Sequence, residues 1–323
     1  VFPLQLLCYC LVQRDREITV VCTNTFYAPL IAALAAGKRG RVVHLVYDLF
    51  PDALIQAGQI ADGGLAERIL SRLAKLTFQR CHANVFLGSK LLQHARQRHG
   101  EIPNASVIPV GADSSRIKAS WPKKALEMKP ITVLYCGNMG RMHDVDTVLG
   151  YLGRESDCLK SASQMRLLFH ATGVGYERLK RELNRSLKRK DVEIALRSSL
   201  PEAQWIEVLR EAEVALVTMT SGAERIVMPS KAYSALLAGH AILAVCERNS
   251  DLAETVLEHD CGWVVSPGDA AGLEKVLEEI RTNPEELFRK RERAYEAGHR
   301  LYDSPVLSRQ WLQLFDQLSC TSN

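Results

Sequence analysis

No apolar run in this sequence reaches the roughly 18 residues that a membrane-spanning helix needs. The nine cysteines do not fall into the spacings of a zinc site, and there are no internal repeats or low-complexity tracts. The basic residues are not interleaved with aromatic ones, and no nucleic-acid recognition motif is present. These absences exclude a membrane-spanning helix, a zinc-stabilised domain and a repeat array within this sequence, and they argue against DNA or RNA binding.

What is present is typical of a soluble globular protein. The chain has 323 residues, with 47% hydrophobic and 24% charged residues, which suits two domains. The net charge of +4 is uneven, because residues 1–120 hold 14 basic and 8 acidic residues while the remainder holds 27 and 29. The basic first part indicates a surface that meets anions, although scattered solvated charges are an equal alternative.

The cysteines indicate a reducing compartment. Several lie inside apolar runs, among them Cys22, Cys136 and Cys246, where cysteine behaves as a small buried hydrophobe. The first twelve residues, VFPLQLLCYCLV, lack the basic flank and the small-residue cleavage site of a signal peptide. We therefore expect a buried helix at the start of the chain and a cytoplasmic location.

Short β-branched runs alternate with helical patterns along the chain, which predicts a doubly wound α/β fold with parallel sheets. The alternation breaks at 116–130, a stretch with two prolines and no periodicity. We therefore predict a first domain over 1–120, a linker over 121–130, a second domain over 131–304 and a final helix over 305–323. The predicted strands cover 18–22, 42–47, 84–87, 106–110, 131–136, 165–171, 192–195, 214–218, 241–245 and 262–265.

The first candidate phosphate-binding element is the loop after the strand ITVLYC. Gly137 and Gly140 permit a positive φ and a close approach of backbone N–H groups to a ligand, and Asn138 lies between them. A helix expected from about residue 144 would point its positive end at the same place, and Arg141 and His143 add donors. An ordinary strand-to-helix turn is the alternative, because the spacing is not that of the dinucleotide fingerprint.

The second element is Pro229-Ser230-Lys231, about ninety residues further on. Proline suits the first turn of a helix, and the N–H groups of Ser230, Lys231 and Ala232 would then be available to an anion. Lys231 would act as a point charge on phosphate. The alternative is a solvent-facing lysine, although a cation there opposes the helix dipole.

Two further positions are weaker contact candidates. Gly173, in the loop ATGVG, follows another strand, and Glu224 lies in a loop at 221–228 that could close over a ligand. A tight turn explains Gly173 equally well. Together the elements predict a nucleotide-sugar site that holds a diphosphate without a metal ion.

Several ordered motifs resemble a known family. YCGNMGRMHDVDTVL, HATGVG, MPSKAYSALLAGHAILAV and CGWVVSPGDAAGLEKVL are similar to the carboxyl-terminal domain of family 4 glycosyltransferases. VVCTNTFYAPLIAALAA, LVYDLFPDALIQAG and NVFLGSKLLQHARQRHG resemble the acceptor domain of the branch that builds O-antigen, colanic acid and related envelope polysaccharides. The resemblance covers nearly the whole chain.

The resemblance implies the GT-B fold, in which two Rossmann-like domains face each other across a cleft and the last helix crosses back to the first domain. It also implies retaining, metal-independent transfer of a hexosyl or N-acetylhexosaminyl group, without a cofactor, from a UDP- or GDP-type sugar to a lipid-linked or saccharide acceptor. By position, Gly137, Asn138 and Gly140 would line the diphosphate, and Pro229, Ser230 and Lys231 would hold phosphate.

The sequence also departs from the family pattern. Asn138 and His143 stand where the family has Arg and Lys, and Ser234 replaces the second Glu of the acidic pair, which holds the ribose. Tyr47 replaces an active-site His, next to the candidate cleft residue Asp48. The family's opening strand and glycine-rich loop are not in this sequence, so we expect the first domain to be incomplete at its start.

These departures keep two other functions open. A non-catalytic relative that binds nucleotides or acts as a scaffold subunit would tolerate all of them. A nucleotide-sugar epimerase would need convergent proton-transfer groups, for which Asp48, Asp52 and His44 are the candidates.

The segment 65–80 predicts an amphipathic helix. Arg68, Arg72 and Lys75 fall on one side, and the apolar side carries leucines and Ile69. Such a helix can lie on an anionic membrane leaflet, which would place the protein on the inner face of the cytoplasmic membrane. The alternative is a domain helix that packs its apolar stripe on the sheet.

Overall fold

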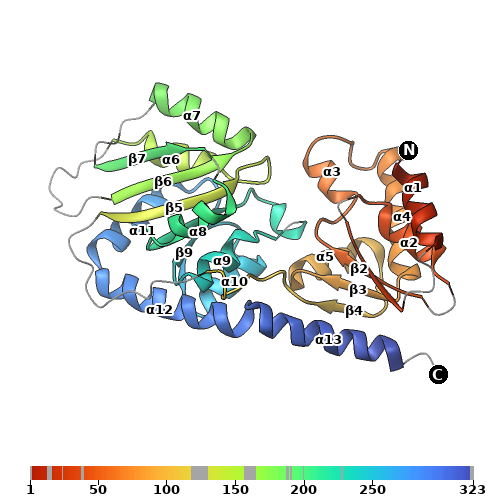
Figure 1. The fold of residues 1–323 in the computed structure, drawn as a ribbon. Coiled ribbons are helices and arrows are strands. Elements are labelled where there is room, and N and C mark those ends of the chain that lie inside the picture. The colour runs from red at the N-terminus through yellow and green to blue at the C-terminus, as the bar shows by residue number, and fades with distance from the viewer. Residues whose placement is uncertain are drawn as a thin grey trace. The chain divides into compact units, whose positions relative to one another are not determined.

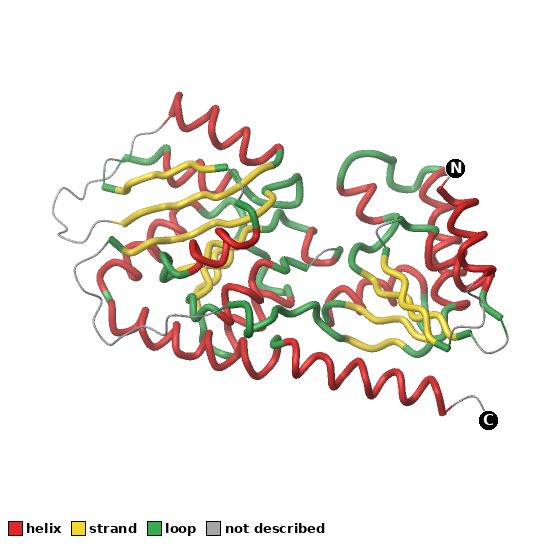
Figure 2. Tube along the Cα trace, in the orientation of Figure 1, coloured by secondary structure: helices red, strands yellow, loops and turns green. Residues whose placement is uncertain are grey.

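The computed structural model contains two compact units, each with its own parallel sheet (Figures 1 and 2). Unit 1 comprises Val1–Val110, Arg225–Met228 and Pro305–Asn323, and unit 2 comprises Gly111–Glu224 and Pro229–Ser304. The structure describes residues 2–12, 17–23, 25–37, 40–117, 130–155, 165–186, 189, 191–198, 200–226 and 228–320.

The sheet of unit 1 has four parallel strands in the order β1-β2-β3-β4. Short β-branched runs form these strands because each is bounded by turn residues and covered by helices. The strands are β1 (Ile18–Cys22), β2 (Arg41–Val46), β3 (Ala83–Phe86) and β4 (Ala105–Val107). The helices between them are α1 (Phe2–Val12), α2 (Ala28–Ala35), α3 (Asp52–Gln56), α4 (Leu65–Arg80) and α5 (Ser89–His99).

Apolar side chains of unit 1 pack on both faces of this sheet. On one face, Phe86 of β3 joins Phe78 of α4 and Leu91 of α5. On the other face, α13 (Ser304–Cys320) packs Leu307 and Leu318 against strand residues of β2 and β3. The last helix of the chain therefore completes the core of unit 1, which also contains the first residues of the chain.

The first helix differs from the sequence-based expectation. A helix is present over Phe2–Val12, but Leu4 is 69% exposed and Val12 is 80% exposed. The expected burial is wrong because α1 is apolar around nearly its whole circumference, whereas it packs mainly along one neighbour, α2.

Unit 2 contains a six-stranded parallel sheet in the order β10-β9-β8-β5-β6-β7. Its strands are β5 (Ile131–Asn138), β6 (Met165–Thr172), β7 (Val192–Arg197), β8 (Val214–Thr218), β9 (Ala241–Val245) and β10 (Gly262–Val265). The helices are α6 (Asp146–Leu152), α7 (Val174–Ser186), α8 (Glu202–Leu209), α9 (Lys231–Leu237), α10 (Asp251–Glu258), α11 (Ala270–Thr282) and α12 (Pro284–Leu301), with a short 3₁₀ turn η1 (Ala223–Arg225).

Helices cover both faces of the unit 2 sheet. Residues that alternate along each strand point to opposite faces. Tyr135 faces a core formed with α6, α7 and α11, whereas Leu134 faces a second core with α8 and α9. The order of the strands makes this a doubly wound Rossmann-like sheet. From β5 the chain adds β6 and β7 on one side, and it then adds β8, β9 and β10 on the other side, so the strand order reverses between β5 and β8.

The two strands at this reversal separate early. β5 pairs with β8 through only two residue pairs, Val133↔Val214 and Leu134↔Ala215, whereas it pairs with β6 along all eight of its residues. Beyond Leu134 the carboxyl-terminal ends of β5 and β8 are no longer paired, at the point where ligands bind in sheets of this kind.

All ten strands predicted from the sequence are present, with ends shifted by no more than three residues. The sequence missed α3 and η1, which are too short to show a periodic pattern. Most of the predicted linker over 121–130 lies outside the described residues. Within the described part, no helix is both long enough and apolar enough to cross a membrane.

A glycine in β10 tests the packing of this sheet. A Cβ added at Gly262 would lie 1.9 Å from the Ile242 carbonyl oxygen of β9, so the backbone of one strand must move. We expect Gly262→Ala to destabilise unit 2 by about 3 kcal/mol, as other overpacked sites do. The matched control is Gly268→Ala, which has a φ of +86° and open space around it, and should cost about 1–2 kcal/mol. Equal shifts of the calorimetric midpoint in the two variants would contradict the expectation.

Candidate functional site

The candidate site of unit 2 is built around Lys231, the first residue of α9. Its Nζ donates to the Tyr135 hydroxyl at 2.6 Å and to the Asn138 carbonyl oxygen at 3.2 Å. The same ammonium lies 4.1 Å from the centroid of the Tyr135 ring. Lys231 belongs to α9, which covers one face of the sheet, whereas the side chain of Tyr135 lies on the opposite face, so Lys231 reaches from one face to the other. It does so beyond the point where β5 and β8 cease to pair.

Among the residues that the structure describes, the neighbours of the Lys231 ammonium are neutral. Within the described residues no ion pair joins it to a carboxylate, and its two hydrogen-bond acceptors are a hydroxyl and a carbonyl. Burial lowers the pKa of Lys231 to about 7, and the nearby Cys136 acts weakly in the opposite direction. An ammonium placed in this way is stabilised when an anion binds next to it. The alternative of a solvent-facing lysine at the helix start is wrong, since the side chain is half-buried and held at both acceptors.

The glycine loops form the adjoining wall. Gly137 has a φ of +119°, and a Cβ there would come within 4.0 Å of Lys231 Cε. Gly173 has a φ of +99°, and a Cβ there would lie 2.3 Å from Asn138 Oδ1. The loops after β5 and β6 are thus packed against each other through Asn138, and glycine at 137 and 173 is required by conformation or by space. A Cβ at Gly140 would lie 3.4 Å from Asn138 Nδ2, so this residue also belongs to the wall.

His143 lies on the same loop and faces the Tyr135 ring edge-on, with the ring centroids 6.0 Å apart. Its Nδ1 lies 2.8 Å from the Thr218 carbonyl oxygen of β8. Burial and, to a smaller extent, the charge of Lys231 lower the pKa of His143 to about 4. His143 is therefore neutral near pH 7 and provides a hydrogen-bonding group rather than a second positive charge.

Two features expected from the sequence are not present. The N–H of Ala232 donates to the Pro229 carbonyl oxygen at 3.0 Å, so it is not available to an anion. At the start of α6 the Thr147 N–H donates to Asp144 Oδ1 at 2.8 Å, so this N–H is not available either. These two N–H groups could not be predicted as occupied, because the sequence does not show which local carbonyl or carboxylate accepts from each N–H.

Most of the other predicted residues lie close to Lys231 in the sequence. Pro229 is buried, Ser230 is exposed at the N-cap of α9, and Ser234 is half-buried one turn further on. Arg141 is exposed on the loop after β5, and Glu224 is buried in η1. No contact described for these residues joins them to Lys231, so their part in binding stays a prediction.

The candidate proton-transfer residues lie in unit 1, where each has its own structural partners. His44 is buried with Nδ1 3.2 Å from Asn84 Oδ1, and burial lowers its pKa to about 4. Asp52 lies 2.8 Å from His94 Nε2 and 3.3 Å from Arg98 Nε. Burial would raise the pKa of Asp52, but these two partners lower it overall. Asp48 is half-buried, and its N–H donates to Thr23 Oγ1. Because each of the three residues has different partners, the contacts show no shared proton-transfer group and do not support the epimerase function.

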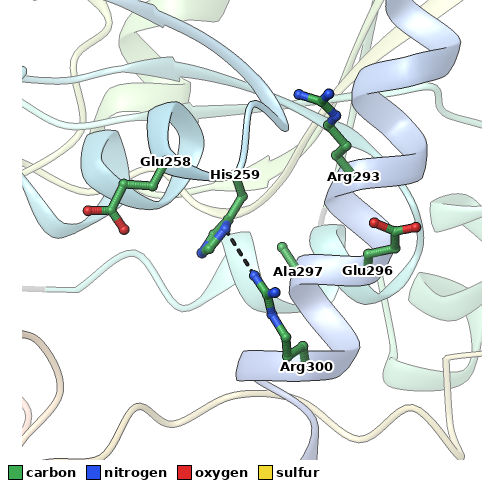
Figure 3. A pocket seen from close by; sticks show the side chains of 6 residues that line it. All are labelled: Glu258, His259, Arg293, Glu296, Ala297 and Arg300. Carbon is green, nitrogen blue, oxygen red and sulfur yellow. Dashed lines mark hydrogen bonds between the residues drawn. The ribbon is translucent and has the colours of Figure 1, made fainter.

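A second hollow of unit 2, of about 480 Å³, lies between the end of α10 and α12 (Figure 3). Arg300 and His259 approach each other there at 3.2 Å. Glu258 and Glu296 line the same hollow, so its charges balance and it is less suited to an anion than the Lys231 site. Among the residues that the structure describes, no group of three or more His, Cys, Asp or Glu is placed to hold a metal ion.

Tyr135 is a member of the site that was not predicted. The sequence predicts it only as a strand residue, because no local pattern identifies a tyrosine that will meet a lysine 96 positions away. The one available signal is that Tyr135 is a large polar aromatic in an otherwise aliphatic strand immediately before the Gly137 loop.

Comparisons with known proteins agree with this architecture. No family model matches the chain. The chain is 25% identical over 285 residues to the probable glycosyltransferase WbjE of Pseudomonas aeruginosa, covering 84% of this chain and 68% of that protein. Among solved structures, sucrose-phosphate synthase of Thermosynechococcus elongatus has a TM-score of 0.77 at 15% identity, covering 99% of this chain and 78% of its own. Anabaena Alr3699/HepE in complex with UDP has a TM-score of 0.73 at 13% identity, covering 97% and 82%.

The predicted resemblance and the predicted fold are confirmed by these comparisons. The chain has the α/β GT-B architecture of these structural neighbours, with parallel sheets of four and six strands. The chain is similar to a probable glycosyltransferase, as the resemblance to family 4 predicts.

The unpaired burial of Lys231 predicts a pH-dependent stability. Its pKa is lower in the folded protein than in the unfolded chain, so protonation opposes folding, and stability rises with pH from about 7 towards the unfolded pKa. We expect Lys231→Met, which removes this charge, to be more stable than wild type at pH 6, with the difference narrowing towards pH 9. The measurement is urea unfolding at both pH values. Lys275→Met, at an exposed lysine of α11, is the control, and a pH-independent difference for Lys231→Met would contradict the assignment.

Proposed function

We propose that this glycosyltransferase transfers a sugar, hexosyl or N-acetylhexosaminyl, from a nucleoside diphosphate donor to a lipid-linked or saccharide acceptor in polysaccharide biosynthesis. The observation that carries the proposal is Lys231, an ammonium without a carboxylate partner at the reversal point of the donor-type sheet. Gly137, Asn138, Gly140 and Gly173 would approach the diphosphate with their backbone, and Arg141, Ser230 and His143 would add donors.

The reaction that we propose is retaining and needs no metal. The acceptor oxygen forms a bond to the anomeric carbon on the face from which the bond to the β-phosphate oxygen breaks. The electron pair of the broken bond leaves with the nucleoside diphosphate, and the acceptor proton passes to the departing phosphate oxygen. Lys231 would stabilise the negative charge that develops on this phosphate, which is the kind of electrostatic stabilisation that lowers barriers most.

The donor type is supported by the structural neighbours, since HepE is described in complex with UDP and with UDP-glucose. A UDP- or GDP-type sugar is therefore the first class to test, and no cofactor enters the scheme. Ser234 and Glu224 would contact the ribose or the sugar, and Asp48 of unit 1 the acceptor.

A non-catalytic nucleotide-binding relative is the second candidate. It is favoured by Asn138 and His143, which replace two charged residues of the family loop and leave Lys231 as the cation held inside the described site. A thermal shift with nucleoside diphosphates, without sugar transfer to any acceptor, would support this candidate against the enzyme.

Replacement of Lys231 tests the enzyme directly. We expect Lys231→Ala to lower the rate of sugar transfer by about 10²-fold, the usual cost of removing one stabilising donor. The measurement is transfer from a panel of UDP- and GDP-sugars to lipid-linked acceptors, with circular dichroism to show that the fold is kept. Lys275→Ala serves as the control, and unchanged turnover in Lys231→Ala would exclude the proposed role.

We further propose that α4 contacts an anionic membrane surface, on the inner face of the cytoplasmic membrane. Four of its basic residues are exposed and form no ion pair within the described part of the chain: Arg68, Arg72, Lys75 and Arg80. Leu65 is 76% exposed and Ile69 is 48% exposed, so the start of the predicted apolar stripe does not pack on the sheet. Exposed leucine and isoleucine next to unpaired arginines suit an interface of acyl chains and anionic headgroups.

Vesicle binding tests the membrane contact. We expect the wild type to sediment with phosphatidylserine vesicles and not with phosphatidylcholine vesicles, and Arg68→Glu/Arg72→Glu to lose this binding, since each basic residue contributes about 1 kcal/mol near such a surface. Arg185→Glu, at an exposed arginine of α7 in unit 2, should bind as the wild type does. Equal sedimentation with both kinds of vesicle would remove the proposal.

A further inference from the structure

The ammonium of Lys231 has one N–H group whose hydrogen bond is not accounted for by the two described acceptors. It carries three N–H groups, of which one donates to Tyr135 Oη and a second to the Asn138 carbonyl oxygen. One N–H remains, and its direction is fixed by the other two. The long side chain of lysine is otherwise flexible, so this direction depends on how firmly the two acceptors are held.

Tyr135 is held very firmly. Its side chain is fully buried, its ring stacks on Phe169 with centroids 6.2 Å apart, and the ring edge of His143 covers it from the loop. Its hydroxyl donates to the Asn138 carbonyl oxygen at 3.1 Å and accepts from Lys231. The hydroxyl therefore ties together the lysine, the strand end and the glycine loop in a single place.

We propose that Tyr135 is the positioning residue of the donor site, and that its hydroxyl orients the Lys231 ammonium so that the remaining N–H meets a phosphate oxygen of the nucleoside diphosphate sugar. This inference rests on the proposed function. Tyr135 itself acts through Lys231, because its buried hydroxyl is already occupied by two partners.

The arrangement makes a pH-dependent test possible. The titratable groups that face Lys231 are Tyr135 and Cys136 on β5 and His143 on the following loop. Burial raises the pKa of Tyr135 and raises that of Cys136 to about 11, and the pKa of His143 is about 4. These three groups stay neutral between pH 6 and 9, and a diphosphate diester keeps its charge over the same range. Of the groups that face Lys231, only Lys231 itself changes its charge in this window. Between pH 6 and 8 the bases of the sugar nucleotides also stay neutral, so a change of affinity in that range is assigned to Lys231.

The experiment measures the affinity of UDP-glucose and GDP-mannose by calorimetry between pH 6 and 8, where the bases of both ligands stay neutral. For the wild type we expect binding to weaken as the pH rises through the pKa of free Lys231, because the diphosphate favours the protonated amine. Tyr135→Phe keeps the ring but removes an acceptor of the charged form, so the amine loses its proton at lower pH. For a drop of about one pKa unit, affinity falls about tenfold at pH 8 and only about twofold at pH 6.

The control variants separate the possible outcomes. Tyr302→Phe removes another tyrosine hydroxyl, one that lies 2.8 Å from Thr255 Oγ1, and should reproduce the wild-type profile. Lys231→Ala should bind weakly at every pH. If Lys231→Ala loses the pH dependence but Tyr135→Phe keeps the wild-type profile, or weakens equally at every pH, the inference about Tyr135 is overturned and the role of Lys231 stands. If Lys231→Ala binds as the wild type does, or the wild type binds neither sugar nucleotide, the proposed function is overturned as well.

Discussion

Unit 2 depends on one electrostatic constraint, a half-buried lysine ammonium whose described neighbours are neutral. Lys231 has a hydroxyl, a carbonyl and an aromatic ring as neighbours, and none of them cancels its charge. Folding alone does not favour such a position, because burial of an unpaired charge costs free energy. A group that destabilises its own fold and lies where the strand order of a doubly wound sheet reverses is best explained by the anion that we propose it binds.

The backbone prepares this position. β5 and β8 share only two pairs of residues, so their carboxyl-terminal ends are not paired with each other, and the Lys231 side chain meets Tyr135 there. The positive φ of Gly137 then turns the chain away without a side chain that would meet Lys231. Asn138 has two separate tasks, since its carbonyl oxygen accepts from Lys231 and its side chain packs against Gly173. Sheet topology, glycine geometry and charge thus act on the same few residues.

Much of this architecture could be predicted from the sequence, because hydrophobic periodicity and turn residues are local properties. The ten strands, the Gly137 loop and the helix after Pro229 were all found in that way. Three features could not be predicted. The exposure of α1 depends on how many neighbours cover an apolar helix, and the occupied N–H of Ala232 depends on the local turn geometry. The contact between Tyr135 and Lys231 joins residues 96 positions apart, which no local pattern specifies.

The position of the last helix has a consequence for folding during synthesis. The core of unit 1 includes Leu307 and Leu318, although its sheet is built from residues before 110. Unit 2 lies almost entirely between these two parts of the chain and contains all of its own strands. During synthesis the later unit can therefore reach its final packing first. Unit 1 cannot complete its core until α13 has left the ribosome, and one face of its sheet stays uncovered until then.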